Sequence, residues 1–472
     1  MCSFENIVKR DTHIFFTLKK FGLMIGPFAA ATVFLSLQGH GWNQEACWAG
    51  AVATICAFWW IFEPIPIPAT SLIPIGLLPL FGVLTPREVG QSYGSPMVLL
   101  LLGGFILSTA MAKSGAHLRV AVIMINLFGG QSSKKLVYGF MAAAAILSMW
   151  ISNTATTLML LPVALATIER SEDKKLAAPL LLGIAYAASI GGIGTPIGTP
   201  PNLVFREIYQ QNTGVEVGFF TWMSWGIPVV AILIPLAGLW ITRNLGYLGK
   251  VSVPEISAWN SEEKRVFTVF FLTAIAWVSR SQPFGGWQSW LNLPNANDAS
   301  VALVAVVAMF LIPNGKGGKL LDWSTASDIP WGMLLLFGGG IAIANSFVSS
   351  GLSASLGQSL AYISTWHLFL LILAICLLIT FLTEMTSNLA TTTLILPILA
   401  AMSLSSNISP EALMVPAAMS ASCAFMLPVA TAPNTIVFST SKFPLALMAK
   451  EGLLLNLMGA MIIASICALL FD

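Results

Sequence analysis

Charged residues are scarce in this sequence. Only 9% of the 472 residues are Asp, Glu, Lys or Arg, whereas 56% are apolar, and the mean hydropathy is +0.83. Because soluble domains carry about 25% charged residues, this composition excludes a soluble globular protein and indicates a polytopic membrane protein. The net charge of +2 gives no information about partners, and the sequence shows no nucleic-acid-binding signature.

Cysteine and histidine are also few. The six cysteines lie mostly inside apolar segments, without the spacing of a metal site or of a disulfide framework. We interpret them as small packing residues. The four histidines fall in flanking segments and loops. The segment from Gly130 to Lys134 does not match a P-loop, so we do not expect an ATP-driven pump.

Long apolar segments, in contrast, are abundant. A transmembrane helix needs about 20 mainly apolar residues. About eleven candidate spans lie near residues 21–38, 47–63, 66–84, 96–112, 176–204, 219–242, 265–282, 297–313, 330–350, 411–439 and 452–470. Basic residues precede the first of them without a clear cleavage site, so we expect a retained span rather than a signal peptide.

Two further apolar stretches, 136–168 and 367–402, do not fit simple spans. Each has a Ser-Asn cluster at its centre, and half of each stretch would form about 24 Å of helix, less than the ~30 Å hydrocarbon core. Basic residues flank 136–168 on both sides, so both of its ends should lie in the cytoplasm. No Lys or Arg occurs between Lys319 and Lys442, which suits entry from outside. We therefore predict two re-entrant hairpins that enter from opposite sides.

The basic residues also predict the orientation of the chain. With the N-terminus in the cytoplasm, only Arg87, Arg206 and Arg280 of the 22 basic residues lie outside. This bias agrees with the positive-inside rule and places the C-terminus outside. We therefore expect a multi-pass protein of the cell membrane, of the bacterial inner-membrane type.

The Ser-Asn cluster is part of an internal repeat. The run Ser-Asn-Thr-Ala-Thr-Thr that begins at Ser152 returns 235 residues later, at Ser387, as Ser-Asn-Leu-Ala-Thr-Thr. The similar segments 101–115 and 337–351 cross the membrane in opposite directions in this arrangement, which predicts inverted repeats. We divide the chain into an N-terminal cytoplasmic segment with the first span (1–46), repeat 1 with hairpin 136–168 (47–243), a cytoplasmic linker (244–264), and repeat 2 with hairpin 367–402 (265–472).

Polar and irregular segments inside the membrane point to a binding site. Unpaired polar groups cost several kcal/mol in hydrocarbon, so the Ser-Asn clusters are expected to line a cavity. Glycine and proline in 191–202 and 428–434 interrupt two spans and expose carbonyl groups, which suit a hard cation. Helix N-termini at Asn153 and Asn388 suit an anion. In the plainer interpretation, the polar residues only form hydrogen bonds between packed helices, and the glycines and prolines only produce kinks. The duplication of both features favours a binding site.

Four motifs resemble those of the divalent anion:sodium symporter family, which carries di- and tricarboxylates or sulfate. The motifs are Met149–Thr156, Gly198–Asn202, Thr383–Asn388 and Cys423–Thr431, and the resemblance covers nearly the whole chain. It implies an all-α polytopic membrane fold of about 11 transmembrane helices plus two re-entrant hairpins in inverted repeats. It also implies a homodimer in which a transport domain moves against a scaffold domain, as an elevator does.

The resemblance further implies sites for two sodium ions and one substrate. The first sodium site would use Ser148, Ser152, Asn153 and the carbonyl of Gly198. The second would use Thr383, Thr386, Asn388 and the carbonyl of Ala430. The substrate carboxylates would contact Asn153, Thr154, Thr199, Pro200, Asn388 and Thr431. Three residues near the substrate depart from common family patterns: Leu389 stands where many members have threonine, Ala432 replaces a usual proline, and Thr199 stands where serine is frequent.

These observations predict a sodium-coupled secondary active symporter of a small dicarboxylate such as succinate, malate or fumarate. No Lys or Arg occurs in the motifs, so bound sodium and helix dipoles would offset the anion's charge. Citrate and sulfate are alternative substrates. The intramembrane residue Glu384 leaves open a proton-coupled or exchanging carrier, or a purely structural role in orienting the hairpin. An enzyme is not expected, because it would need a nucleophile–base pair or a metal cluster and neither hairpin tip has His or Cys.

Overall fold

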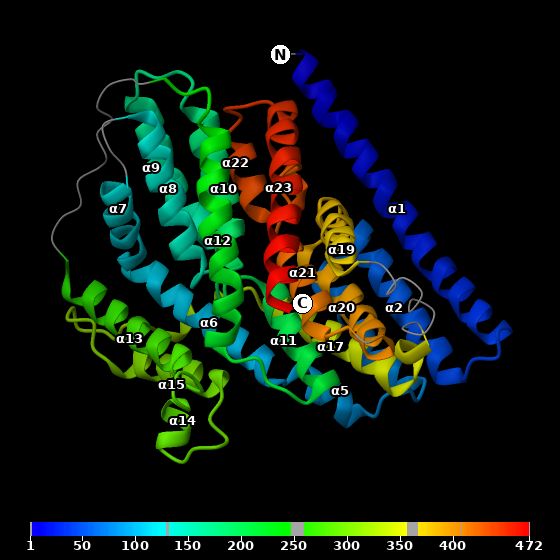
Figure 1. Ribbon diagram of the computed structural model, residues 1–472. Coiled ribbons are helices and arrows are strands. Elements are labelled where there is room, and N and C mark those ends of the chain that lie inside the picture. Colours follow the sequence, from blue (N-terminus) through cyan, green and yellow to red (C-terminus); the bar gives the residue numbers. More distant parts are fainter. Residues whose placement is uncertain (1, 129–131, 247–258, 356–366, 407, 472) are drawn as a thin grey trace.

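The computed structural model describes residues 2–128, 132–246, 259–355, 367–406 and 408–471 (Figure 1). Within these ranges the chain forms helices, turns and one isolated β-bridge between Pro313 and Lys319. Most of the predicted linker 244–264 falls outside the described residues.

The helices of the first half are α1 (Cys2–Gly39), α2 (Gln44–Phe62), α3 (Ile67–Thr70), α4 (Ile73–Leu80), α5 (Pro86–Tyr93), α6 (Pro96–Ser114), α7 (Ala116–Phe128), α8 (Ser133–Ser148), α9 (Asn153–Arg170), α10 (Ala177–Gly192), α11 (Pro200–Thr213) and α12 (Phe219–Ile241). Those of the second half are α13 (Ser261–Val278), α14 (Gly286–Trp290), α15 (Asp298–Leu311), α16 (Trp323–Ala326), α17 (Trp331–Ser349), α19 (Leu368–Thr383), α20 (Asn388–Ser405), α21 (Pro410–Ser420), the 3₁₀ turn η2 (Pro428–Ala430), α22 (Ala432–Ser439) and α23 (Leu445–Phe471).

Helix lengths and compositions confirm the predicted polytopic all-α class. In the described part of the chain, 7 helices are long and apolar enough to cross a membrane: Phe21–Gly39 of α1, the stretch Pro86–Ser114 formed by α5 and α6, and α2, α12, α17, α20 and α23. Shorter apolar helices accompany them at Ile67–Leu80, Ala116–Leu127, Ala177–Gly192, Asp298–Leu311 and Leu368–Thr383. The predicted spans therefore comprise both long helices and shorter pieces.

Two predicted breaks are present, and a third was not predicted. α10 ends at Gly192 before α11 begins at Pro200, and α21 ends at Ser420 before α22 begins at Ala432. The predicted span 66–84 is also divided, into α3 and α4, because prolines occupy the first turns of both helices, where proline is tolerated. In addition, α7 is helical in a part of the chain where neither a span nor a hairpin was predicted.

Each predicted hairpin consists of two helices joined by a short connection. The first connection is 149–152, between α8 and α9, and the second is 384–387, between α19 and α20. Serine occupies the N-cap of the helix that follows in both cases, a position that serine favours because its side chain can accept a backbone N–H bond. The Oγ of Ser152 accepts such a bond from the Ala155 N–H at 3.2 Å.

The two halves of the molecule interlock. α10 packs against α8 and α9, and α21 packs against α20 and α19. α11 contacts α20 of the other half, while α22 contacts α9, so each broken helix reaches the hairpins of both halves (Figure 1). α6 likewise contacts α13 and α15, whereas α17 contacts α2, α4 and α5. This exchange brings the two hairpin connections and the two helix breaks together in the middle of the structure.

Close helix packing depends on small residues. A Cβ atom at Gly191 of α10 would lie 2.3 Å from the carbonyl oxygen of Ala145 in α8, so only glycine fits there. Small residues let helix backbones approach closely in membranes, where lipid is as apolar as the side chains. The contact holds the end of α10 against the first hairpin, next to the break.

A buried charge cluster ties α11 to the second half. Arg206 Nη2 lies 2.7 Å from Asp298 Oδ2, and Arg280 Nε lies 2.7 Å from Asp298 Oδ1. Arg280 also pairs with Glu216. The exposed fraction is 0% for Arg206 and 2% for both Arg280 and Asp298. Two of the three arginines that the sequence predicts to be outside are therefore buried in ion pairs, which a low-dielectric interior requires of such charges.

Candidate functional site

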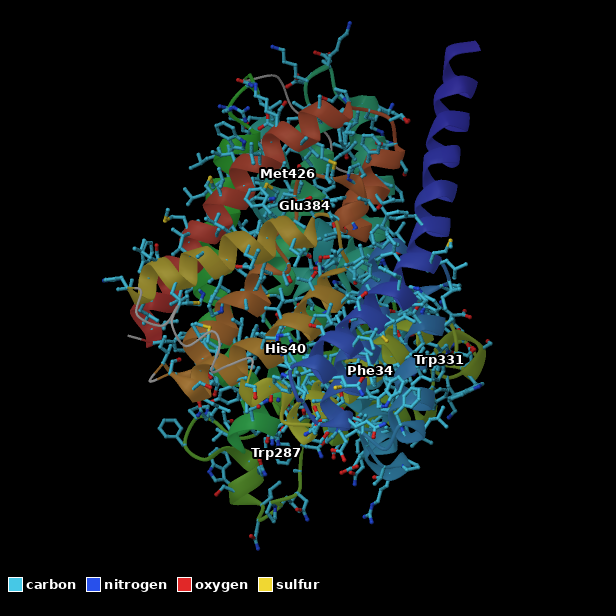
Figure 2. All side chains as sticks on the ribbon, turned by 90° about the vertical axis from the view of Figure 1, so that its right-hand side faces the viewer. Phe34, His40, Trp287, Trp331, Glu384 and Met426 are labelled. Atoms are coloured by element: carbon cyan, nitrogen blue, oxygen red, sulfur yellow. The ribbon has the colours of Figure 1, made fainter. Side chains whose placement is uncertain are left out.

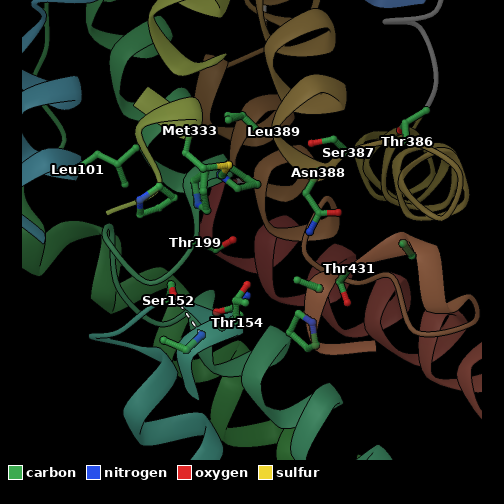
Figure 3. Close-up of a pocket in the computed structure, with 18 of the residues that line it drawn as sticks. Leu101, Ser152, Thr154, Thr199, Met333, Thr386, Ser387, Asn388, Leu389 and Thr431 are labelled. Carbon is green, nitrogen blue, oxygen red and sulfur yellow. Dashed lines mark hydrogen bonds between the residues drawn. The ribbon is translucent and has the colours of Figure 1, made fainter. Parts of the chain in front are cut away.

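A cavity of about 790 Å³ lies where the hairpin connections and the helix breaks meet. Figure 3 shows Thr154 and Thr199 on one side of it and Asn388 and Thr431 on the other. Its lining includes ten of the twelve predicted site residues: Ser152, Asn153, Thr154, Gly198, Thr199, Pro200, Thr386, Asn388, Ala430 and Thr431. The other two, Ser148 and Thr383, are fully buried just behind it.

Ser148 and Thr383 each make a hydrogen bond to an asparagine of the cavity. Ser148 Oγ lies 2.6 Å from the Asn153 side-chain amide, and Thr383 Oγ1 donates to Asn388 Oδ1 at 2.7 Å. The two pairs are related by the sequence offset of 235, and each crosses its hairpin connection. Repeated sequence has therefore produced a repeated geometry in which the helix before the connection orients the first residue of the helix after it.

The two helix breaks resemble each other, because an asparagine amide donates to two backbone carbonyls at each of them. Asn202 Nδ2 donates to the carbonyls of Gly192 and Thr195 at 3.0 and 2.8 Å. Asn434 Nδ2 donates to the carbonyls of Ala424 and Leu427, both at 3.0 Å. All three positions of the second set follow those of the first by 232 residues. These amides compensate backbone carbonyls that the broken helices leave without partners.

Oxygen atoms converge beside Asn153. The inward-facing atom of its side-chain amide lies 3.2 Å from the carbonyl oxygens of both Ala188 and Gly198. The hydrogen-bond network assigns nitrogen to that atom, which donates to both carbonyls and to Ser148 Oγ. Three oxygens, from Ser148, Ala188 and Gly198, therefore surround this end of the amide. Carbonyl and hydroxyl oxygens are ligands that suit a hard cation.

The second hairpin provides a comparable but not identical set of oxygens. Besides its bond to Asn388, Thr383 Oγ1 lies 3.2 Å from the Ala421 carbonyl oxygen, a second acceptor for the same hydroxyl proton. Thr386 Oγ1 donates to the Leu382 carbonyl at 2.9 Å and also bonds to Thr391 Oγ1. The hydroxyl of Thr386 is therefore engaged within its own hairpin, whereas the side chains of Thr383 and Asn388 face one another across the connection.

Four helices begin at the cavity wall. α9, α11, α20 and α22 start at Asn153, Pro200, Asn388 and Ala432, all of which line the cavity. A helix N-terminus presents unpaired N–H groups and a partial positive charge. Four such ends directed at one space create an anion-binding environment, as predicted for the starts at Asn153 and Asn388.

Part of the lining was not predicted from the motifs. Apolar residues of α2, α6 and the start of α17 cover one side: Trp60, Ile61, Phe62, Leu101, Phe105 and Met333. The charged lining residues among those described are Lys19 of α1 and Glu63 at the end of α2. In the sequence, these apolar residues look like any membrane span, and Glu63, at the end of a span, was expected to be a scaffold or interface residue.

Comparisons with known proteins agree with this arrangement. A family model described as "Citrate transporter" matches residues 57–413. The sodium-dependent dicarboxylate transporter SdcS of Staphylococcus saprophyticus is 39% identical over 468 residues, covering 94% of this chain and 89% of that protein. SdcS of Staphylococcus aureus (strain MRSA252) is 40% identical over 476 residues, covering 95% of this chain and 90% of that protein.

A solved structure shares the fold. The crystal structure of the Alcanivorax borkumensis YdaH transporter, reported to have an unusual topology, aligns with a TM-score of 0.58 over 83% of this chain and 88% of that one, at 17% identity. These relatives are transporters rather than enzymes. Together, the family model and the two SdcS relatives show that the chain belongs to the divalent anion:sodium symporter family of membrane carriers.

Proposed function

We propose that this protein is a secondary active symporter that couples sodium entry to the uptake of a small dicarboxylate across the cell membrane. The observation that carries the proposal is the shared cavity in which converging oxygens lie beside four helix N-termini. Such a site suits cations and an anion together. The SdcS relatives, named sodium-dependent dicarboxylate transporters, support sodium as the coupling ion and a dicarboxylate as the substrate. Succinate, malate and fumarate are the small dicarboxylates that we propose.

The proposed ligands follow the two halves of the site. The first sodium ion would bind Ser148, Ser152, Asn153 and the Gly198 carbonyl, and the second would bind Thr383, Thr386, Asn388 and the Ala430 carbonyl. One substrate carboxylate would lie against Asn153, Thr154, Thr199 and Pro200, and the other against Asn388 and Thr431. The converging oxygens at Asn153 support the first sodium site, and the bonds of Thr383 support the second.

The coupling would follow from charge balance. A dianion in this cavity meets helix N-termini, while the charges of Lys19 and Glu63 in the lining are opposite, so bound sodium ions would supply most of the compensating charge. Sodium would therefore bind first, and the affinity for the anion would depend on it. Symport without leakage requires that the cavity opens to the opposite side of the membrane only when both the cations and the anion are bound.

An elevator movement fits the arrangement of the helices. The domain that moves would contain the hairpins α8–α9 and α19–α20 with α10–α12 and α21–α23, and the remaining helices would form the scaffold of a homodimer. We keep the division into 1–46, 47–243, 244–264 and 265–472, with the N-terminus in the cytoplasm. Lys19 precedes the first apolar segment, so its place in the cavity wall supports a cavity that opens toward the cytoplasm.

The proposal can be tested with purified protein in proteoliposomes. Sodium and pH gradients should be imposed separately, and uptake of labelled succinate should follow the sodium gradient alone. Uptake driven by the pH gradient without sodium would contradict sodium coupling. Crosslinking in native membranes would test the homodimer, because a single monomeric band would contradict it.

Citrate is the second candidate substrate, because the matching family model is described as "Citrate transporter". The cavity volume of about 790 Å³ leaves room for a tricarboxylate. Competition between labelled succinate and unlabelled citrate, malate, fumarate and sulfate would separate the candidates. We expect the dicarboxylates to compete at lower concentration than citrate or sulfate.

A further inference from the structure

Glu384 is the carboxylate of the second hairpin connection, and it follows Thr383 directly in the sequence. Its exposed fraction is only 3%. Its Oε1 accepts a hydrogen bond from the Met426 backbone N–H, and its Oε2 accepts one from the Leu427 backbone N–H, both at 2.9 Å. Figure 2 shows Glu384 and Met426 next to one another inside the molecule.

Asn456 of α23 completes this arrangement. Its Nδ2 donates to Glu384 Oε1 at 2.7 Å, and its Oδ1 accepts from the Phe425 backbone N–H at 3.1 Å. Two side chains from different parts of the chain thus bind three consecutive N–H groups in the segment between α21 and α22. A Cβ at Gly452, one turn before Asn456, would lie 2.1 Å from the Phe425 carbonyl oxygen, so α23 touches this segment directly.

In the first half of the molecule, the equivalent contact between the hairpin connection and the helix break contains no carboxylate. At the position equivalent to Glu384, offset by 235, stands Met149, whose backbone carbonyl accepts from the Thr195 hydroxyl. Ile193 is equivalent to Phe425 at the offset of 232, and its carbonyl accepts from Trp222 Nε1 at 2.9 Å. The repeated fold therefore does not require Glu384, and the second half uses a different chemistry at the same contact.

This contact fixes the position of the segment between α21 and α22 relative to the second hairpin connection. Glu384 lies between Thr383 and Asn388 in the chain, while the segment that it binds leads directly to Ala430 and Thr431. An N–H group left without a partner in the membrane interior is costly, so the bonds fix the segment relative to the hairpin connection. The oxygens on both sides of the second half of the cavity are thereby held at a constant separation.

We propose that Glu384 and Asn456 are positioning residues that set the geometry of the second cation site, an inference that rests on the proposed function of this cavity. Both oxygens of Glu384 accept bonds from N–H groups of the protein, so the residue acts through the 425–427 backbone rather than by carrying a proton. It contacts neither the substrate nor the ions in this role.

The test uses Glu384→Gln, which keeps the shape of the side chain but places an NH₂ donor against a backbone N–H. Glu169→Gln is the matched control, because Glu169 is exposed near the end of α9. Uptake of labelled succinate into proteoliposomes would be measured against sodium concentration and against succinate concentration at saturating sodium. Losing a hydrogen bond to a charged group predicts about a tenfold rise in the half-saturating sodium concentration, with the succinate KM changed by less than about twofold.

Several results would overturn this inference. Unchanged sodium dependence in Glu384→Gln would remove the positioning role, and so would loss of maximal rate with normal sodium dependence. Wild-type uptake that ignores sodium would instead refute the proposed function. If Glu384→Gln does not fold, Asn456→Leu replaces it, since leucine has a similar size but lacks both the donor to Glu384 and the acceptor for Phe425. It too should need about tenfold more sodium, and a normal sodium requirement would refute the inference.

Discussion

Replacement of Asn153 by aspartate tests the proposed site most directly. A carboxamide offers an oxygen to a cation and an NH₂ group to an anion, so Asn153 would serve both ligands. Aspartate keeps the oxygens, loses the donor and adds a negative charge. Two unit charges about 4 Å apart interact by about 4 kcal/mol at an effective dielectric constant of 20. We therefore expect Asn153→Asp to weaken dicarboxylate binding by about a thousandfold and to strengthen sodium binding.

The measurement separates the two effects. Sodium binding would be followed by thermal stabilisation of the purified protein without substrate, and succinate binding by calorimetry at saturating sodium. Asn153→Ala removes the amide without adding charge, so the difference between the two variants isolates the electrostatic contribution. Asn292→Asp adds the same charge at an exposed position of a loop and should behave like the wild type. Succinate binding of near-normal affinity in Asn153→Asp would refute the reasoning.

Three further predictions concern coupling and stability. Succinate binding to the wild-type protein should fall at least tenfold when sodium is replaced by choline, since the cations supply compensating charge; equal affinity in both salts would contradict this. Asp298→Asn should lower the free energy of unfolding by about 3–5 kcal/mol, because it leaves Arg206 and Arg280 without their shared buried carboxylate; an unchanged Tm in detergent would argue against the pairing. Gly191→Ala should lower the free energy of unfolding by about 1–3 kcal/mol, because its Cβ would meet the Ala145 carbonyl oxygen at 2.3 Å. A wild-type Tm for this variant in thermal unfolding would contradict the close contact.

The local sequence predicted the features that are unusual inside a membrane helix, namely polar residues, glycines and prolines within apolar stretches. Ser152 and Ser387 stand inside apolar stretches, and both prove to be N-caps of helices that begin at the cavity. The break before Pro200 was visible because closely spaced glycines and prolines disfavour a regular helix. Each of these signals depends on a few neighbouring residues, so local composition was enough to locate the hairpins and the breaks.

Contacts between residues far apart in the chain could not be predicted from the local sequence. Arg206 and Asp298 are 92 residues apart, and nothing near either residue indicates that they meet. Trp60 and Met333 line the cavity, yet in sequence they resemble lipid-facing residues, because hydropathy does not distinguish a cavity wall from a lipid contact. The division of 66–84 into α3 and α4 was missed for a different reason, since its prolines are also compatible with a kinked span.

The order of residues along the chain suggests why cation and anion binding would depend on each other. In the proposed site, Gly198 binds sodium and Thr199 binds substrate, and the same succession holds for Ala430 and Thr431. The fixed bonds of Asn202 and Asn434 hold both breaks as short rigid units. An ion that draws a carbonyl inward must therefore move the neighbouring hydroxyl and the helix N-terminus that follows it. Coupling in this carrier would then arise from adjacent atoms in two repeated segments and would require no long-range pathway.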